Sequence, residues 1–344
     1  MSIPTRMRAG QMKGAAACLL VLMSTSQVLA QERLPIIDMH LHAHAADHQG
    51  TPPRGICAPF TEFPAWDPAR PWGVVFAEMQ RDPPCDDPLW SPTTDEALRD
   101  STLAALERHN IIGVLSGSPD RVAEWSNRAA DRIISGLELF GRDVDVSPDS
   151  IRELHRDGSL RVLAEVSSQY LGIAPDDPRL DPYWALAEEL DIPVGIHIHP
   201  GPPGTPYLGG PTHGLHSPLL LEQVLVRHPR LRVYVIHAAW PQLDDMLTLL
   251  FTHPQVYVDV GGLVYIHPRA DFYRYLRALV EAGFANRVLF GSDQMIWPQA
   301  IDRAIQSIEE APFLTESQKR DIFYNNAARF LRLSDEDIRR HHAM

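Results

Sequence analysis

Cysteines, nucleophile motifs and nucleotide-binding motifs are scarce or absent in this chain of 344 residues. It contains three cysteines in all. No Gly-x-Ser-x-Gly element marks a serine nucleophile, and Ser116-Gly117-Ser118 does not fit that pattern. Neither a phosphate-binding loop nor the glycine fingerprint of dinucleotide-binding folds is present. The sequence therefore argues against a serine-nucleophile mechanism and against nucleotide-dependent chemistry.

Basic clusters are also lacking. The chain has 31 lysines and arginines against 44 aspartates and glutamates, which gives a formal net charge of −13. An acidic chain without a basic patch is a poor partner for nucleic acid, so we expect a small-molecule substrate instead. Beyond the first thirty residues no run is apolar enough to cross a membrane, and we expect no membrane association of the mature protein.

The first thirty residues have the features of a secretory signal peptide. Arg6, Arg8 and Lys13 form a basic start, an apolar stretch follows over residues 15–23, and Val28-Leu29-Ala30 offers a small-residue cleavage pattern. A single membrane anchor is the alternative, but the apolar stretch is short for one. Cleavage after residue 30 leaves one domain over residues 31–344, in a secreted or periplasmic location. Loss of the three basic residues brings its net charge to −16.

Two cysteines, Cys57 and Cys85, remain after this cleavage. In an oxidising compartment two cysteines this close in sequence are expected to form a disulfide, with two free thiols as the alternative.

Eight apolar runs alternate with amphipathic stretches along the rest of the chain. A strand followed by a helix, repeated eight times, predicts an α/β fold, the (β/α)8 TIM-type barrel with a parallel sheet. The predicted strands are Ile36–His42, Ile111–Ser116, Ile133–Leu139, Leu160–Val166, Pro193–His199, Leu231–His237, Val256–Val260 and Val288–Ser292.

Residues 45–90 interrupt this alternation. They form a long, proline-rich insertion after the first strand, hold both cysteines and show little helical periodicity. Inserted loops of this length are commonly functional lids. At the other end of the chain, we expect the tail from Asp335 to fray.

The most informative stretch is Asp38-Met39-His40-Leu41-His42, at the end of the first strand. Strand side chains alternate between faces, so His40 and His42 are expected to project to one side with Asp38. Two neutral imidazoles there can bind one metal ion, although histidines of a core or a surface have the same spacing.

Metal-capable side chains also stand at the ends of five further predicted strands, where barrel enzymes carry their active sites. They are Glu165, His197 with His199, His237, Asp259 and Asp293. This recurrence, more than any one motif, predicts a metal site.

The chain resembles the amidohydrolase-related family of the metal-dependent amidohydrolase superfamily, which includes aminocarboxymuconate-semialdehyde decarboxylase and related decarboxylases and hydrolases. The matching segments are Asp38-Met39-His40-Leu41-His42, Pro193-Val194-Gly195-Ile196-His197, Val235-Ile236-His237-Ala238-Ala239-Trp240-Pro241, Phe290-Gly291-Ser292-Asp293 and Asn325-Asn326-Ala327-Ala328-Arg329-Phe330. They span nearly the whole mature chain but do not specify a substrate.

The resemblance implies that His40, His42, His197 and Asp293 hold one divalent metal ion, zinc by preference. Strand spacing leaves His197 and His199 as alternatives, and the family's interval from proline to histidine favours His197. Glu165 either bridges to a second metal ion, together with His237, or orients a ligand.

Asp38 and Asp259 are expected to orient ligands from outside the ligand set. His44 and His48 fall in the loop beyond the first strand and are expected to face solvent or substrate.

Four residues that follow strand ends are candidates for substrate binding: His199, Trp240, Tyr207 and Trp297. Tyr170 is a further candidate of the same kind. Aromatic side chains at a barrel mouth serve packing as often as binding, so both roles stay open.

The expected function is metal-dependent hydrolysis of an amide, ester or lactone by a metal-activated water, with Asp293 and His237 as catalytic residues. The alternative is a metal-dependent decarboxylase of the aminocarboxymuconate-semialdehyde decarboxylase type. A catalytically idle binding protein is a third reading, but it would not need His237 together with Asp293. Members of this family often form homodimers, which is the expected assembly.

Overall fold

The computed structural model describes residues 33–140, 146–210 and 213–344. The predicted leader over residues 1–30 lies outside these residues. Eight parallel strands form one sheet in the order β1-β4-β5-β6-β7-β8-β9-β10. The strands are β1 (Ile36–His42), β4 (Ile111–Ser116), β5 (Ile133–Leu139), β6 (Val162–Val166), β7 (Val194–His197), β8 (Val233–Ile236), β9 (Val256–Asp259) and β10 (Val288–Leu289). Every predicted strand is therefore confirmed, some with shorter ends.

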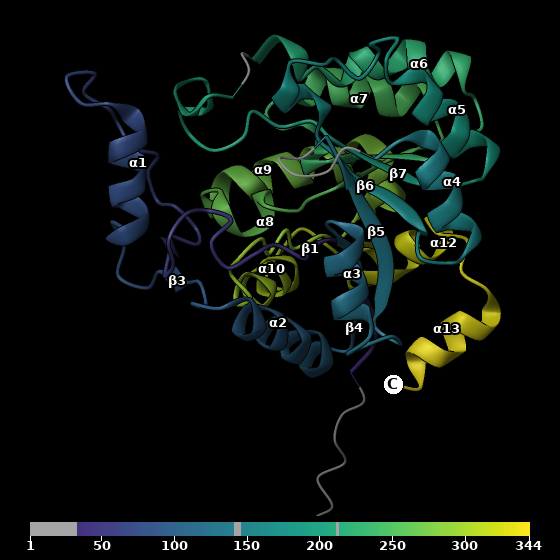
Figure 1. Ribbon diagram of the computed structural model, residues 1–344, viewed down its shortest axis with the longest axis horizontal. Coiled ribbons are helices and arrows are strands. Elements are labelled where there is room, and N and C mark those ends of the chain that lie inside the picture. The colour runs from purple at the N-terminus through teal and green to yellow at the C-terminus, as the bar shows by residue number, and fades with distance from the viewer. Residues whose placement is uncertain (1–32, 141–145, 211–212) are drawn as a thin grey trace, which may run out of the picture. The chain divides into compact units, whose positions relative to one another are not determined.

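The sheet closes between its first and last strands. The backbone N–H of Met39 in β1 donates to the carbonyl of Phe290, directly after β10, at 2.9 Å. Together with the strand order, this contact confirms the predicted (β/α)8 barrel. Figure 1 shows the strands at the centre with helices around them.

Helices follow the strands as the alternation predicts. The Ser147-Pro148 pair shows how one begins: the Ser147 hydroxyl accepts a hydrogen bond from the Ser150 N–H, and Pro148 opens the helix. The helices are α1 (Trp72–Arg81), α2 (Asp95–His109), α3 (Pro119–Ser126), α4 (Pro148–Arg156), α5 (Asp181–Glu189), α6 (Glu222–Arg227), α7 (Leu243–Thr252), α8 (Leu263–Ile266), α9 (Arg269–Leu279), α10 (Ala300–Glu309), α11 (Glu316–Arg320), α12 (Asn326–Phe330) and α13 (Asp335–His342). In the described part of the chain, none has the length and apolar character needed to span a bilayer.

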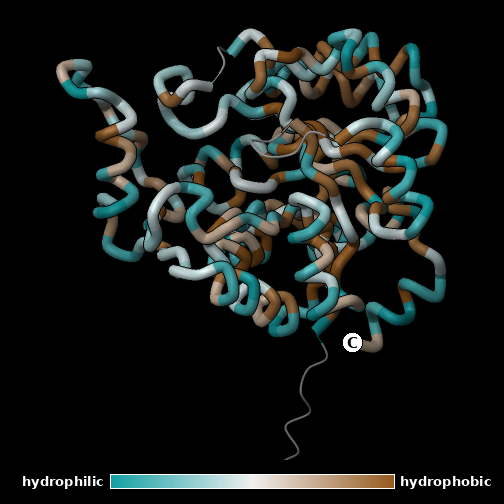
Figure 2. The backbone as a smooth tube through the Cα atoms, in the orientation of Figure 1, coloured by the Kyte–Doolittle hydropathy of each residue, from teal (hydrophilic) through white to brown (hydrophobic). Residues whose placement is uncertain are grey.

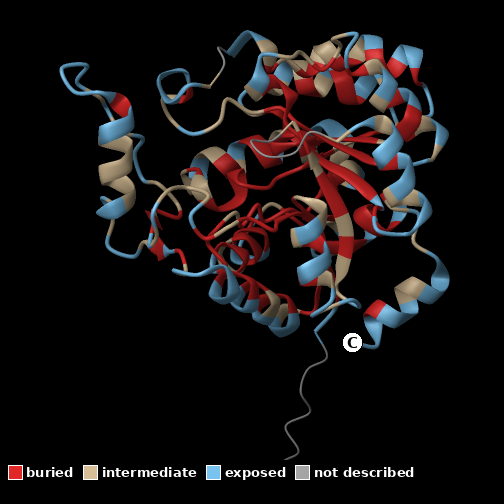
Figure 3. Cartoon of the chain, in the orientation of Figure 1, coloured by how far each residue is buried: buried red, intermediate tan, exposed pale blue. Residues whose placement is uncertain are grey.

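The core has two parts. The larger lies between strands and helices, and the smaller joins apolar strand residues such as Ile37, Met39 and Tyr234 to α12. Apolar segments gather in the strands (Figure 2), which are buried, while the outer faces of the helices are exposed (Figure 3). This packing leaves one end of the strands free to carry polar side chains.

The insertion after β1 is a disulfide-tied unit and contains more structure than expected. β2 (Gly55–Ile56) and β3 (Leu89–Trp90) pair antiparallel, and α1 lies between them at the left of Figure 1. The expectation of little helical structure here is wrong, because α1 forms on an apolar stretch beginning at Trp72. The predicted Cys57–Cys85 disulfide is present, with a Cα–Cα distance of 6.0 Å.

Hydrogen bonds join the insertion to loops of the barrel. The Phe60 N–H donates to the Ile266 carbonyl at 2.9 Å, after β9. The Trp72 indole donates to the Pro203 carbonyl at 2.8 Å, after β7. The Trp297 indole, after β10, donates to the Arg54 carbonyl at 2.9 Å. The insertion therefore contacts the loops that follow three barrel strands.

Candidate metal centre

Two histidines of β1 start the site. Asp38 pairs with Gly113 and Leu41 with Leu115, so β1 has one residue more than β4 over this stretch. The register between the two strands therefore shifts there. His40 and His42 are both buried, and their Nε2 atoms lie 3.1 Å apart. Two nitrogen ligands of a tetrahedral zinc, each at about 2.0–2.1 Å from the ion, would lie about 3.3–3.4 Å apart. The pair is therefore spaced like two ligands of one ion.

Asp293 completes this pair from the other side of the barrel closure. Its Oδ1 lies 3.1 Å from the His42 Nε2 and 3.6 Å from the His40 Nε2. Asp293 has a positive φ of 53°. Two hydrogen bonds fix its backbone: its N–H donates to the His40 carbonyl at 2.8 Å, and its carbonyl accepts from the Tyr265 hydroxyl at 2.8 Å. His40, His42 and Asp293 form a group able to hold a metal ion.

Glu165, the last-but-one residue of β6, also enters the cluster. Its Oε2 lies 3.4 Å from the Nε2 atoms of both His40 and His42, and its Oε1 lies 3.6 Å from the His197 Nε2. Glu165 thus connects the β1 pair to the histidine at the end of β7. A carboxylated lysine in this place is excluded within the described residues, where Lys319 is the one lysine and lies on α11.

His237 follows β8 and presents one defined nitrogen. Its Nδ1 lies 2.7 Å from the Gly261 carbonyl, so Nδ1 carries the hydrogen and Nε2 keeps its lone pair in the neutral ring. His237 forms groups able to hold a metal ion with Glu165 and His197, and with His40 and Asp259. The structure therefore brings together all five predicted ligands and His237.

Behind these side chains, carboxylates and amides fix their orientation. The Asp259 Oδ2 lies 3.2 Å from the His40 Nδ1, while its Oδ1 accepts from the N–H groups of His237 and Gly261. The Asp38 Oδ1 accepts from the N–H groups of His40 and Ser292. Both aspartates lie next to ligand histidines, and orienting those ligands stays their predicted role; Asp259 also belongs to one group able to hold a metal ion.

Two glutamines contact ligand histidines, and the sequence analysis did not predict either of them. The Gln294 side chain accepts from the His42 N–H at 3.0 Å and donates to the His42 carbonyl at 2.7 Å. The Gln169 amide contacts the His197 Nδ1 and donates to the His197 carbonyl at 2.7 Å. No spacing rule predicts a glutamine in such a role. The one available signal is that Gln294 directly follows Asp293.

The charges of the cluster favour a cation. Burial alone would lower the pKa of His40, but the carboxylates of Asp293 and Asp259 outweigh it and raise that pKa well above its usual value. Burial alone would raise the pKa of Glu165, but His197 and His40 outweigh it and lower that pKa well below its usual value. With no ion bound, a proton on His40 therefore provides part of the positive charge that these carboxylates attract. Buried carboxylates and imidazoles within ligand distance of one another fit a divalent metal ion.

A second histidine group shares a member with the first. The His44 ring stacks on His42 at 4.3 Å and on His48 at 3.7 Å, and its Nε2 lies 3.8 Å from the Glu138 Oε2. His42, His44 and Glu138 could hold a metal ion. His42 is a member of both groups.

The predicted substrate-binding residues divide into two pairs. His199 and Trp240 lie beside the cluster, with the His199 ring 4.9 Å from His237 and 5.6 Å from Trp240. Trp297 is buried and packs the insertion against the barrel, while Tyr207 is 65% exposed and packs on Trp66. Tyr170 places its hydroxyl 3.3 Å from the His197 Nε2. Substrate binding stays a prediction for all of them.

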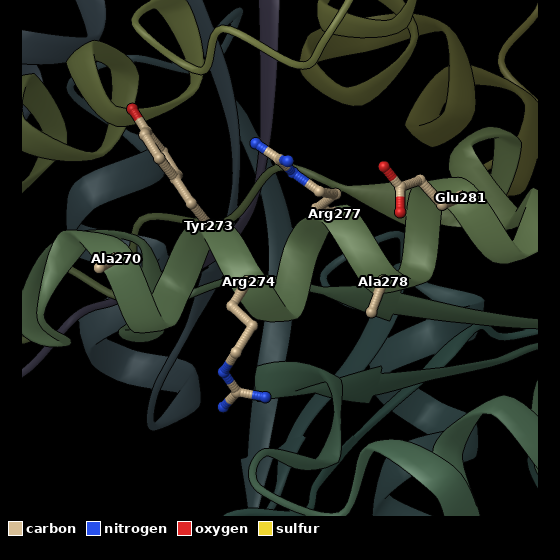
Figure 4. Close-up of a pocket in the computed structure, with 6 residues that line it drawn as sticks. All are labelled: Ala270, Tyr273, Arg274, Arg277, Ala278 and Glu281. Carbon is tan, nitrogen blue, oxygen red and sulfur yellow. The ribbon is translucent and has the colours of Figure 1, made fainter.

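A surface depression of about 490 Å³ lies apart from the cluster, along α9. Figure 4 shows Tyr273 and Arg277 projecting from one side of this helix and Arg274 from the other. Arg274 pairs with Asp271, and Arg277 lies over the Phe313 ring. These cations already have partners, and none of the residues lining the depression belongs to the cluster.

The fold and the site define a class of protein: a parallel barrel with a buried group of metal-capable residues at the ends of its strands. Comparison with known proteins agrees with this class. The sequence model of the Amidohydrolase family matches residues 37–333. The chain belongs to the amidohydrolase family and is an enzyme of that superfamily, whose members normally bind a divalent metal.

The curated relatives share one activity. Gamma-resorcylate decarboxylase of Rhodococcus jostii is 26% identical over 270 residues, covering 66% of this chain and 79% of the relative. The enzyme of the same name from Rhizobium radiobacter is 26% identical over 269 residues, covering 66% and 78%.

Solved structures show the same fold. A TIM-barrel protein of Bordetella bronchiseptica superposes with a TM-score of 0.58 at 19% identity, covering 87% of this chain and 99% of the other. A 2,6-dihydroxybenzoate decarboxylase bound to 2,6-dihydroxybenzoate has a TM-score of 0.55 at 17% identity, covering 88% and 100%. A protein described as a probable 2-pyrone-4,6-dicarboxylic acid hydrolase of Acinetobacter baumannii has a TM-score of 0.54 at 16% identity, covering 87% and 99%. Decarboxylases and a hydrolase share this fold, so the fold does not choose between the reactions.

Proposed function

We propose that this protein is a metal-dependent decarboxylase acting on an aromatic acid that carries hydroxyl groups. One observation carries the proposal: all three curated relatives, which match two thirds of the chain, are gamma-resorcylate decarboxylases. The expectation of a hydrolase gives way to its alternative for this reason. The cluster by itself suits either reaction, because a divalent cation can bind a carboxylate or activate water.

In this proposal His40, His42, His197, Glu165 and Asp293 hold one divalent ion, zinc by preference. When bound, the ion supplies positive charge that holds the substrate's carboxylate side and stabilises the charge that develops during bond cleavage. Asp259 and Gln294 keep His40 and His42 oriented. The buried site also keeps water away from the reacting carbon.

His237 is the residue best placed to move a proton. Its Nδ1–H stays on the Gly261 carbonyl, so Nε2 can gain and lose a proton without disturbing the ring. The bond between the ring carbon and the carboxyl carbon breaks, its electron pair stays on the ring carbon, and carbon dioxide leaves. The proton on the His237 Nε2 then passes to that carbon, and the neutral ring takes a replacement proton from water, so the reaction balances without an oxidant, a reductant or a nucleotide.

Incubation of the zinc-loaded protein with carboxyl-labelled 2,6-dihydroxybenzoate tests the reaction. We expect labelled carbon dioxide and 1,3-dihydroxybenzene, with one deuterium incorporated when the solvent is D2O. His237→Gln should keep its metal content and lose about 10²-fold or more of the rate. The surface variant Asp131→Asn should behave as the wild type. An unchanged acid, together with turnover of an ester, lactone or amide panel, would establish the hydrolase instead.

A secreted or periplasmic location is also proposed. The Cys57–Cys85 disulfide supports it, because such bonds persist in oxidising compartments. Fractionation of cells expressing the full chain, with N-terminal sequencing of the product, tests it. A product beginning at Gln31 outside the cytoplasm is expected, and an uncleaved chain in the cytoplasm would contradict it.

A further inference from the structure

Four rings outside the ligand groups contact one another, starting from His199, whose ring lies 4.9 Å from His237. We name them the His199 subsite: His199, Trp240, His267 and Phe63. His199 follows β7, Trp240 follows β8, and His267 follows α8. Phe63 belongs to the insertion and is 43% exposed. The subsite thus combines residues of three barrel loops with one residue of the insertion.

Ring contacts make these side chains one continuous wall. The His267 ring lies 4.1 Å from Trp240, 5.9 Å from His199 and 5.5 Å from Phe63. Asp271 anchors two of them, since its Oδ2 accepts from the Trp240 indole at 3.0 Å and lies 3.5 Å from the His267 Nδ1. Trp240 and His267 are therefore held in place independently of any ligand.

The hydrogen bonds of His199 define which of its nitrogens carries hydrogen. The Gly201 N–H donates to the His199 Nδ1 at 3.0 Å, so Nδ1 must keep its lone pair. In a neutral ring the hydrogen is then on Nε2.

That Nε2–H is buried and has no hydrogen-bond partner among the described residues. A buried donor without an acceptor is costly, and the cost is removed when a ligand supplies the acceptor. The same hydrogen prevents Nε2 from binding a metal ion. His199 is therefore not a second choice for the ligand role of His197.

His199 and His237 differ in what they offer, although their rings lie 4.9 Å apart. His237 directs a lone pair away from the Gly261 carbonyl, whereas His199 offers a hydrogen. A substrate bound beside both rings meets a proton-transfer group at His237 and a fixed donor at His199.

We propose that the His199 subsite recognises a substrate oxygen that is not held at the metal, with the Nε2–H of His199 donating to it and the neighbouring rings packing on the aromatic ring. The inference deepens the proposed decarboxylase function and rests on it. No ion pair or hydrogen bond joins these rings to an arginine or lysine within the described ranges. A hydroxyl group suits this neutral donor better than a second carboxylate does.

The test compares 2,6-dihydroxybenzoate with 2-hydroxybenzoate, which lacks one of the hydroxyl groups. His199→Phe keeps a ring and removes the donor, whereas His199→Gln keeps an N–H near the position of Nε2. For His199→Phe, the ratio of kcat/KM for the dihydroxy acid to that for the monohydroxy acid should fall about tenfold or more. His199→Gln should recover most of this ratio, and an unchanged ratio in the phenylalanine variant would overturn the subsite.

A second readout needs no turnover and no variant. In zinc-loaded, nitrogen-15-labelled wild-type protein, NMR should show His199 protonated at Nε2, and the dihydroxy acid should shift that signal more than benzoate does. Protonation at Nδ1, or no shift with any of these acids, would overturn the subsite. A shift without carbon dioxide release would overturn the decarboxylase function and keep the subsite. Carbon dioxide release with an unaffected His199 signal would overturn the subsite and keep the decarboxylase function.

Discussion

At the scale of single residues, the two carboxylate oxygens of Asp259 contact different parts of the site. Oδ1 accepts from two backbone N–H groups, and Oδ2 faces the His40 Nδ1. A carboxylate oxygen 3.2 Å from Nδ1 favours the tautomer with hydrogen on that nitrogen, which leaves the lone pair of the His40 Nε2 for a metal ion. Asp259 is thus a positioning residue that acts through His40.

Asp259→Asn tests this role with almost no change of shape. An amide can still accept from the backbone through its oxygen, but its NH2 group then faces His40 and favours the wrong tautomer. We expect metal affinity to fall about 10–100-fold, measured by competition with a chelator. Asp131→Asn is the matched control, and an unaltered affinity in Asp259→Asn would refute the role of the Oδ2 contact.

At the scale of elements, the insertion depends on its disulfide more than on a core of its own. Within it α1 buries Trp72 alone, and most of the helix is exposed or half-buried. Cys57 and Cys85 are separated by 28 residues. In the chain-entropy model, a disulfide that closes a loop of this length adds roughly 3–4 kcal/mol to the free energy of unfolding.

Cys57→Ser with Cys85→Ser should therefore loosen the insertion while leaving the barrel folded. Limited proteolysis is expected to cut between residues 57 and 85 much faster than in the wild type, with a similar far-ultraviolet circular dichroism spectrum. Reduction of the wild-type protein should reproduce the effect. Equal protection in the oxidised and cross-link-free proteins would show that loop contacts alone hold the insertion.

The C-terminal helix α13 is, after α1, a second element whose order the sequence did not suggest. The Ser334 hydroxyl and the Asp337 carboxylate cap it reciprocally, and its His341 is buried with Nδ1 3.0 Å from the Tyr324 hydroxyl. The expected fraying is therefore wrong. Polar residues dominate the segment, and a single buried histidine gives no periodic signal.

The docking of α13 should weaken in acid. Burial lowers the pKa of His341 from 6.5 to about 4, so the detached helix binds a proton that the docked helix does not. Stability from this contact is complete above about pH 6.5 and decreases until about pH 4, where the loss levels off. Hydrogen exchange of residues 335–342 across this range measures it. His341→Gln should remove the pH step, and protection independent of pH in the wild type would contradict the prediction.

At the scale of the whole molecule, the cluster couples folding to metal binding. Its donors come from β1, β6, β7 and the loop after β10, so an ion held there joins both ends of the barrel sheet. An ion that binds only the folded chain stabilises it by mass action, by about 4 kcal/mol at a thousand times its Kd.

Removing the metal with a chelator should lower the thermal midpoint, and adding zinc should restore it. The pKa of His40 is raised without an ion, so its protonated ring stabilises the metal-free fold at low pH, and that contribution is lost as pH rises through the raised pKa. The difference in midpoint between metal-loaded and metal-free protein should therefore grow from acidic to mildly alkaline pH. Calorimetry measures it, with His40→Ala as the metal-free control. A difference that does not change with pH would contradict the account.

The order of the fold and most of the site follow from local pattern. Apolar runs of β-branched residues determine the eight strands, and polar residues directly after them determine which side chains meet, because parallel strands end at one edge. His40, His42 and Asp293 were found in this way from strands far apart in sequence. The disulfide followed from two cysteines in a chain with a predicted leader.

Other features were decided only by tertiary contacts. Strand periodicity could not separate His197 from His199, since both face one side; the Gly201 N–H bound to His199 separates them. Glu165 became a candidate ligand through distances of 3.4 Å to two histidines on another strand. The sequence determined which chemical groups are present and at which strand ends they stand. The tertiary structure decided which nitrogen carries hydrogen and which carboxylate faces which ring, because hydrogen-bond partners come from segments that no local pattern relates.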